Sequence, residues 1–269
     1  MTNFSVLISV YVKENPVFLK NCLDSIFNQS VKPTEVILVK DGLLNESLNK
    51  VIDFYSKDHT SLKIYGYKEN KGLGYALSFG LKKCNNDIVV RCDSDDINDL
   101  NRFEQQVEIL EKSNFAILGT NIEEFDFNPG DANRFRNLPQ FNLDIQRFKF
   151  SRNPFNHMTV VFRKDIILSA GGYMDMPGYE DYYLWLRVLK NHEGYNIQKP
   201  LVHARVGNDM IGRRQGYKFM KKEIKFQKQI FKEELISKTQ LYNNIFKRVL
   251  PRLLPKMLLL FIYKLFLRQ

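Results

Sequence analysis

Short apolar segments rich in β-branched residues alternate, through the first half of the chain, with segments whose apolar residues recur every three or four positions. The first kind of segment predicts buried strands, and the second predicts helices that pack on a sheet. The expected strands cover residues 5–12, 35–40, 62–67, 87–92 and 115–122. The expected helices cover residues 16–27, 46–56, 72–83 and 101–112.

This alternation predicts an α/β fold with a mostly parallel sheet flanked by helices, because strand–helix–strand units place successive strands side by side in the same direction. The strands are continuously apolar, as expected for a sheet covered on both faces. Ligands of such sheets bind beyond the carboxyl ends of the strands. Five polar side chains lie at or just after the ends of three of the expected strands: Tyr11, Asp41, Asp93, Asp95 and Asp96.

Beyond residue 125 the pattern is less regular, and it divides the chain into a first half, 1–125, and a second half, 126–212. Residues 128–142 are rich in Asn, Pro and Gly and are expected to form a loop. A short strand is expected at 159–163 and a short helix at 166–170. Residues 182–191 are expected to form a longer helix with a strongly apolar face.

The charge is concentrated at one end of the chain. The 269 residues include 40 Lys and Arg against 30 Asp and Glu, which gives a net charge of +10. Residues 213–269 alone hold 15 basic residues and 3 Glu, so the 212 residues before them carry a net charge of −2. A nucleic-acid-binding protein would need its basic residues on the folded body, so this distribution argues against a nucleic-acid partner.

The basic segment 213–269 is expected to be a helical extension. Five lysines recur at steps of three and four residues, and an apolar set follows a second stripe of the same period, which predicts an amphipathic basic helix. Such a helix suits the surface of an anionic membrane, and packing onto the body or onto a partner protomer is the alternative. The two stripes are Lys218, Lys221, Lys225, Lys228 and Lys232, and Tyr217, Met220, Ile224, Phe231 and Leu235.

Three further features bear on the compartment. No apolar run approaches the roughly 18 residues that a membrane-spanning helix needs. The N-terminus has no positive region before its apolar stretch, unlike a signal peptide. Three scattered cysteines suggest a reducing environment. We therefore expect a cytoplasmic protein, peripheral at the inner face of the cell membrane.

The densest acidic cluster is Asp93-Ser94-Asp95-Asp96, directly after the fourth strand. Carboxylates crowded at a strand end repel one another unless a cation joins them, and Mg²⁺ commonly takes one or two carboxylates together with substrate phosphates. The cluster therefore predicts a metal–diphosphate site. An acidic turn that favours the dipole of the next helix is the alternative.

Two other strand ends offer groups for the same ligand. Asp41 precedes a glycine, and its carboxylate could accept the N–H of a base, although an Asp-Gly pair is also common in plain turns. Tyr11 could stack on that base, or it could be a rim tyrosine of the core.

The pair Glu180-Asp181 stands at the start of an expected helix. Acidic residues there cap the helix and favour its dipole, and a carboxylate near a reacting hydroxyl can also act as a general base. His157 is a weaker candidate, because a lone histidine is usually structural. Arg213 and Arg214 could meet a diphosphate, or they could be solvated charges at the start of the basic segment.

Several segments resemble glycosyltransferase family 2, in the same order and spacing over residues 4–210. They are SVLISVYVKENPVFLKNCLDSIFNQSVKPTEVILVKDG, NKGLGYALSFGLKKCNNDIVVRCDSDD, AGGY and YEDYYLWLR. Within the family, the stretches RCDSDDI, HMTVVFRK, EDYYLWLR and ARVGNDMIGRRQG are most similar to bacterial enzymes of amylovoran, exopolysaccharide and O-antigen biosynthesis.

The resemblance implies a GT-A (Rossmann-like) fold and inverting transfer from a nucleotide-sugar, with a UDP-sugar as the expected donor and Mg²⁺ or Mn²⁺ as the metal. Tyr11, Asp41 and Asp93 would then bind the nucleotide, and Asp93 and Asp95 would bind the metal, with Asp95 the more direct ligand. Asp181 would be the catalytic base. Residues 1–212 would form the catalytic domain, with 1–125 binding the nucleotide-sugar and 126–212 the acceptor, a lipid-linked or oligosaccharide chain.

The sequence departs from the family at two positions. Lys40 stands where relatives often have an acidic residue, and Gly207 stands where many have a histidine near the acceptor. Two other functions compete with sugar transfer: a nucleotidyltransferase, which lacks support from any glycine-rich nucleotidyl loop, and a catalytically silent scaffold at the membrane. The joint presence of Asp41, Asp93, Asp95 and Asp181 favours an active enzyme.

Overall fold

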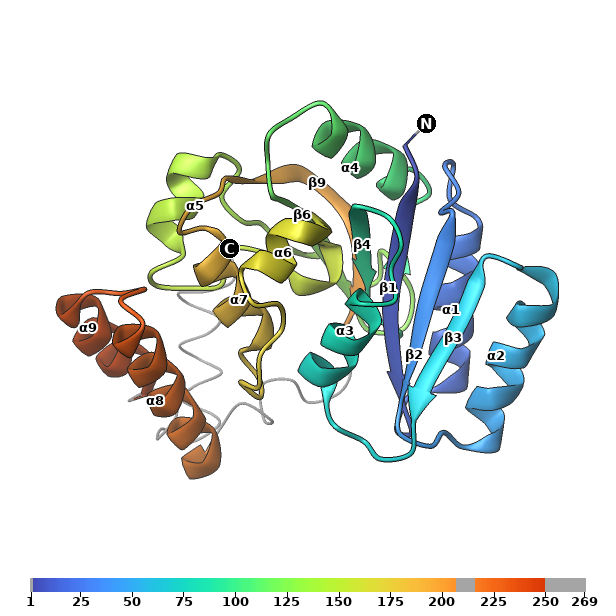
Figure 1. Ribbon diagram of the computed structural model, residues 1–269, viewed down its shortest axis with the longest axis horizontal. Coiled ribbons are helices and arrows are strands. Elements are labelled where there is room, and N and C mark those ends of the chain that lie inside the picture. The colour runs from blue at the N-terminus through green and yellow to red at the C-terminus, as the bar shows by residue number, and fades with distance from the viewer. Residues whose placement is uncertain (1, 207–215, 250–269) are drawn as a thin grey trace.

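The computed structural model describes residues 2–206 and 216–249 (Figure 1). Within these ranges the strands are β1 Phe4–Tyr11, β2 Glu35–Asp41, β3 Leu62–Tyr67, β4 Ile88–Cys92, β5 Ile97–Asn98, β6 Ile117–Phe125, β7 Arg134–Arg136, β8 Val161–Arg163 and β9 Gly194–Arg205. The helices are α1 Pro16–Phe27, α2 Glu46–Asp58, α3 Leu73–Leu81, α4 Arg102–Glu111, α5 Asn142–Phe148, α6 Lys164–Ser169, α7 Glu180–Val188, α8 Gly216–Lys232 and α9 Lys238–Val249, with a 3-10 turn at His157–Thr159.

These strands form one mixed sheet in the order β3-β2-β1-β4-β8-β6-β9-β5, and β7 pairs with β6. The first four are parallel, which confirms the predicted strand–helix–strand units of the N-terminal half. Next to β4 the direction reverses, because the short β8 pairs antiparallel with both β4 and β6. The second half of the chain thus contributes strands to the same sheet as the first.

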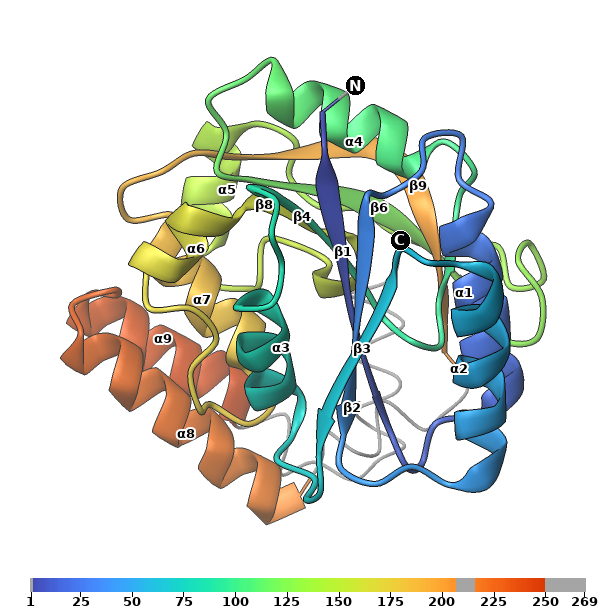
Figure 2. The ribbon, with the colours of Figure 1, turned by 45° about the vertical axis from the view of Figure 1, so that its right-hand side comes forward.

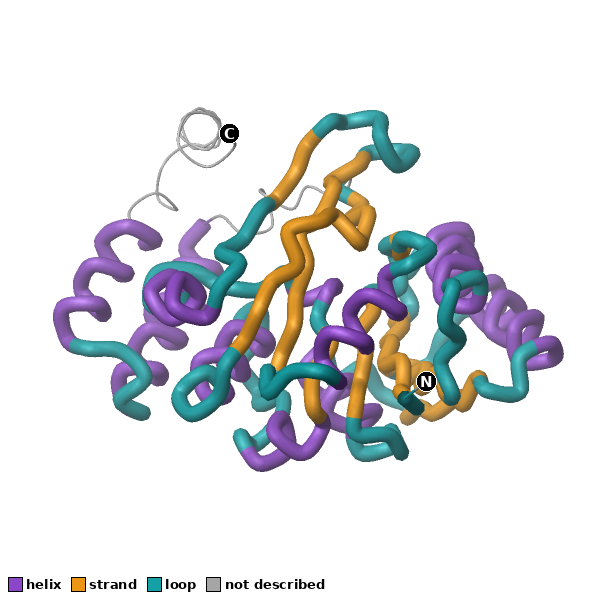
Figure 3. Tube along the Cα trace, turned by 90° about the horizontal axis from the view of Figure 1, so that it is seen from above, coloured by secondary structure: helices purple, strands orange, loops and turns teal. Residues whose placement is uncertain are grey.

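Helices cover both faces of this sheet, as the continuous apolarity of the strands predicted (Figures 1 and 2). Val6 and Ile8 of β1 belong to one buried cluster with residues of α1, α2 and α4. Leu7, between them, belongs to a second cluster with residues of α3 and α7. Seen from above, the strands are gathered in the middle of the molecule with helices to either side (Figure 3).

The second half of the chain contains elements that the sequence pattern did not predict. The segment 128–142, expected to be a loop, includes the short strand β7, and α5 begins at its end. The long strand β9 was also missed, because it is rich in polar residues, contains Pro200 and has a register shift against β6. The helix expected at 182–191 begins two residues earlier, so Glu180 and Asp181 lie in the first turn of α7.

Helices α8 and α9 pack side by side and lie next to α7 (Figures 1 and 2). They share a buried cluster with Tyr179, Tyr182 and Leu186. The buried face of α8 is formed by Glu223, Phe226, Gln227 and Ile230 rather than by the stripe expected from the sequence. Packing onto the body, one of the two expected uses of this segment, is therefore what α8 and α9 display.

In that expected stripe, Tyr217 is 62% exposed and Phe231 is 39% exposed. The final part of the basic segment, 250–269, lies outside the described residues, as do Gly207, Arg213 and Arg214. Within the described ranges, the helices are too short or too polar to cross a membrane.

Candidate active site

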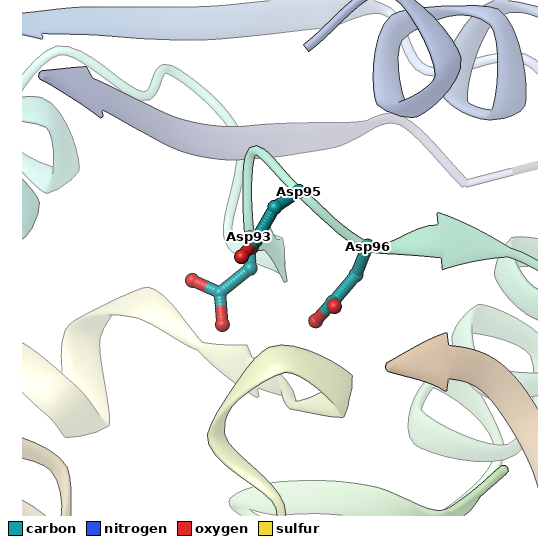
Figure 4. Close-up of side chains that lie close together, drawn as sticks. All are labelled: Asp93, Asp95 and Asp96. Carbon is teal, nitrogen blue, oxygen red and sulfur yellow. The ribbon is translucent and has the colours of Figure 1, made fainter. Parts of the chain in front are cut away.

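Three carboxylates gather in the loop that follows β4, as the sequence predicted. Oxygen atoms of Asp93, Asp95 and Asp96 all lie within 4.8 Å of one another. Figure 4 shows the three side chains on one side of this loop. β4 is buried along its whole length, and its end fixes where the loop begins.

Crowding and burial make these carboxylates difficult to ionise together. Burial, followed by the charges of Asp93 and Glu14, raises the pKa of Asp95 to about 7. Burial and the neighbouring carboxylates of Asp95 and Asp93 also raise the pKa of Asp96. One oxygen of Asp96, Oδ2, is buried and has no hydrogen-bond partner in the described part of the chain. An all-oxygen set of this kind fits a hard divalent cation such as Mg²⁺ or Mn²⁺.

The loop is tied to distant parts of the chain. The backbone N–H of Arg205, at the end of β9, donates to Asp96 Oδ1 over 2.9 Å. The Cys22 thiol donates to the Asp93 carbonyl over 3.0 Å, and Ser94 Oγ donates to Glu14. The carboxylates are therefore held in place by β9 and by α1 as well as by β4.

Arg91, on β4, forms an ion pair with Asp93 and is only 1% exposed. Its Nε and Nη1 atoms have no hydrogen-bond partner among the described residues. A buried arginine stays charged, so it supplies a fixed positive charge beside the acidic cluster. Arg91 was not predicted as a site residue, although a charged residue inside an apolar strand was a signal that could have identified it.

Asp41 is buried at the end of β2, and its carboxylate holds the loop before α3. Oδ1 accepts hydrogen bonds from the Tyr67 hydroxyl and the Lys71 backbone N–H. Oδ2 accepts from Asn70 Nδ2 and the Gly72 backbone N–H. Both oxygens therefore accept two hydrogen bonds each within the protein, an internal role that the sequence argument did not foresee.

Tyr11 ends β1 directly beside Asp41 in the parallel register. Its side chain is 40% exposed, so one part of the ring is open to a ligand at this strand edge. Gly72 begins α3 with a φ of 87°, a conformation that favours glycine. The described geometry thus brings Tyr11, Asp41 and the glycine-rich turn together.

Glu180 and Asp181 have different surroundings in the first turn of α7. Glu180 Oε2 accepts the Gly178 backbone N–H over 2.8 Å, a contact with the loop before α7 rather than with an N–H of the helix itself. Asp181 Oδ2 accepts instead from Asn153 Nδ2 over 2.6 Å. Asn153 is a second residue that sequence reasoning missed, and it orients the carboxylate expected to act as base.

The N-termini of α3 and α7 approach each other closely. A Cβ atom added to Gly74 of α3 would lie 2.8 Å from Cγ of Glu180. Glycine thus allows the two helix starts to meet. Helix N-termini carry partial positive charge, which Glu180 and Asp181 offset at α7, so the start of α3 is the end that favours a ligand with phosphate groups.

His157 is half-buried and packs against the aromatic rings of Tyr173 and Trp185. Its Nε2 lies 3.1 Å from the Tyr173 hydroxyl, and its ring contacts Trp185. Burial and the charge of Arg91 lower its pKa well below the usual range, so it is neutral. The structural alternative weighed for this histidine fits the geometry.

Comparison with known proteins identifies the family. Residues 5–170 match the sequence model of "Glycosyl transferase family 2". A curated Escherichia coli protein, UDP-Gal:alpha-D-GlcNAc-diphosphoundecaprenol beta-1,3-galactosyltransferase, is 41% identical over 99% of this chain and 97% of its own length. The amylovoran biosynthesis glycosyltransferase AmsE of Erwinia amylovora is 39% identical over 97% of this chain and 98% of its own length.

Solved structures agree on the fold. The S. aureus TarS structure with UDP-GlcNAc superimposes with a TM-score of 0.69 and 16% identity, covering 93% of this chain and 72% of that one. This similarity confirms the expected GT-A fold. With a family match over more than half of its length and close relatives along nearly all of it, the chain belongs to glycosyltransferase family 2.

Proposed function

We propose that this protein transfers a sugar from a UDP-sugar to a hydroxyl of a lipid-linked acceptor, as a step in building a surface polysaccharide. One observation carries the proposal: the cluster of three carboxylates at the end of β4 and the oriented Asp181 of α7 belong to one fold, in which the parallel strands β1 and β2 end at the same edge. The E. coli relative is named for a UDP-Gal donor and a diphosphoundecaprenol acceptor, which supports both substrate classes.

Asp93, Asp95 and Asp96 would hold Mg²⁺ or Mn²⁺ together with the donor diphosphate. The cation supplies charge neutralisation for the leaving nucleoside diphosphate. A solved structure of a mannosyltransferase from Pyrobaculum calidifontis in complex with GDP-Man and Mn²⁺ has the same fold. It superimposes with a TM-score of 0.65 and 13% identity, covering 92% of this chain and 69% of that one. Arg91 would hold Asp93 in an ion pair beside the cation.

Asp181 acts as the general base in this proposal. The acceptor oxygen forms a bond to the anomeric carbon while the bond from that carbon to the diphosphate oxygen breaks. Asp181 takes the hydroxyl proton, and the diphosphate leaves with the bonding electron pair. A single displacement of this kind inverts the anomeric configuration. Asn153 is a positioning residue that aims the carboxylate.

Tyr11 would stack on the uracil. Asp41 contributes by shaping the loop of Lys71 and Gly72 that borders the nucleotide, in addition to or in place of a direct contact with the base. A lipid-linked acceptor places the reaction at a membrane surface, which we propose to be the inner face of the cell membrane.

Replacing Asp181 by Asn tests the assignment of the base. We expect transfer to a synthetic GlcNAc-diphosphate lipid to fall by roughly a hundredfold or more, the usual contribution of a general base. Titration calorimetry should give UDP affinity within about twofold of wild type, because the base does not hold the donor. Asp165→Asn, an exposed aspartate of α6, is the matched control and should leave both measurements unchanged.

A donor panel assayed for transfer and for slow release of UDP comes first, to find the active donor. If Asp181→Asn retains near wild-type turnover with that donor, Asp181 is not the base. If no UDP-sugar supports transfer or UDP release, the proposed donor class is wrong.

A further inference from the structure

One face of helix α8 is buried against the body of the protein. Phe226 stacks on Tyr179 with a ring separation of 4.4 Å, and the Tyr179 hydroxyl donates to Glu223 over 2.7 Å. Glu223 and Gln227 are buried with Phe226, and hydrogen bonds satisfy them. This inner face of α8 therefore packs against Tyr179, the residue that directly precedes Glu180 and Asp181.

The outer face of α8 has a different composition. Half-exposed apolar side chains follow one stripe, and exposed lysines follow the stripe beside it. At 100° per residue each stripe spans an arc of roughly 60°. The Lys221 ammonium lies 4.5 Å from the centre of the Tyr217 ring, so the stripes touch. The apolar stripe is Tyr217, Met220, Ile224 and Phe231, and the lysine stripe is Lys221, Lys225, Lys228 and Lys232.

No acidic residue of α8 offsets these lysines, since its single carboxylate, Glu223, is buried on the inner face. Aromatic and aliphatic side chains beside uncompensated lysines are typical of helices that lie in the headgroup region of an anionic bilayer. A second copy of the chain is a poor occupant of this face, because pairing two such faces would bring their lysines together.

We propose that the outer face of α8, defined by these two stripes, docks the protein on the surface of an anionic lipid bilayer. This proposal rests on the proposed function, because a lipid-linked acceptor is the reason for the protein to approach a bilayer. It assigns the contact to described residues of α8, whose other face packs against the start of α7. Docking therefore sets the orientation of the Asp181-bearing helix relative to the membrane.

The test is sedimentation of the full chain with vesicles of phosphatidylcholine containing phosphatidylglycerol. One variant replaces the four outer lysines by Gln, a good helix former. We expect its partition coefficient to fall by about several hundredfold, because each of the four lysines near the surface contributes about fivefold. The matched control makes the same charge change on exposed lysines elsewhere, with Lys50→Gln, Lys57→Gln, Lys63→Gln and Lys112→Gln.

A second variant, Tyr217→Ser with Phe231→Ser, removes the exposed rings. We expect weaker vesicle binding that persists at high salt, where lysine attraction is screened. Phe54→Ser, an exposed phenylalanine of α2, is its control and should bind as wild type.

Equal losses in the outer-face and control lysine variants would overturn the proposal, since net charge alone would then explain binding. So would wild-type vesicle binding by the outer-face variant, or preferential binding of the wild type to single-stranded DNA or polyglutamate over the anionic vesicles. UDP release from a donor needs no membrane and is measured on the same samples. Lost vesicle binding with intact UDP release supports docking, whereas absent UDP release in the wild type contradicts the proposed function alone.

Discussion

Asp41 and Asp95 are both carboxylates at strand ends, yet the protein surrounds them in opposite ways. Asp41 accepts four hydrogen bonds from neighbouring groups, which hold both of its carboxylate oxygens in place. Asp95 is half-buried beside other carboxylates, which disfavours its ionised form. The sequence placed both residues at the ligand edge, but it could not reveal this contrast, because the partners of Asp41 lie about thirty positions further along the chain.

The raised pKa of Asp95 predicts that metal binding depends on pH. When the pH is below the Asp95 pKa of about 7, the carboxyl is protonated, and a cation must displace that proton to bind. Mn²⁺ affinity measured by titration calorimetry should therefore fall by about tenfold per pH unit below pH 7 and level off above it. Asp95→Asn should bind Mn²⁺ weakly at every pH. A wild-type affinity that stays constant on acidification through this range would contradict the prediction.

At the scale of elements, the regular N-terminal half was predictable and the second half was less so. The strands β1 to β4 and their helices can be predicted from the spacing of their apolar residues alone. β9 does not, because its polar residues and Pro200 are tolerated only through its pairing with β6. The inner face of α8 could not be predicted for a similar reason, since Glu223 and Gln227 look like surface residues until Tyr179 and Asn244 supply their partners.

The stacking of Phe226 on Tyr179 predicts that α8 stabilises the start of α7. Phe226→Ala should lower the free energy of unfolding by about 3–5 kcal/mol, the usual cost of deleting a buried phenyl ring. It should also lower kcat more than UDP affinity, because Asp181 lies two residues beyond Tyr179. Urea unfolding and transfer assays measure the two effects.

Phe231→Ala, on the same helix and 39% exposed, is the control for this change. Its loss of stability should be under about 1.5 kcal/mol, since little apolar surface leaves water there. Equal losses in the two variants would contradict the assigned inner face.

For the whole molecule, the charge division at residue 213 does not coincide with a structural division. The chain before it is nearly neutral and the chain after it is strongly basic. However, α8 and α9 share a buried cluster with Tyr179, Tyr182 and Tyr183. Composition located the basic segment but could not reveal that its first helices belong to the packed body.

Removing these helices should therefore destabilise the catalytic body. A chain ending at residue 206 should lose at least about 3 kcal/mol of unfolding free energy relative to one ending at residue 249, because Phe226 and Ile230 are fully buried. Urea titration of the two truncated chains measures this difference. Unfolding at the same midpoint in both would instead identify α8 and α9 as a separate module.

The hydrogen bond from Arg205 to Asp96 has a consequence for the order of assembly. The acidic loop lies between β4 and β5, and β5 pairs only with β9 in the described sheet. Contacts between residues so distant along the chain form late, because a long loop must close first. During synthesis, the hydrogen bond from Arg205 that ties down the loop of the three carboxylates therefore cannot form until about residue 205 has emerged. The growing polypeptide therefore completes its cluster of carboxylates only after β9 has joined the sheet.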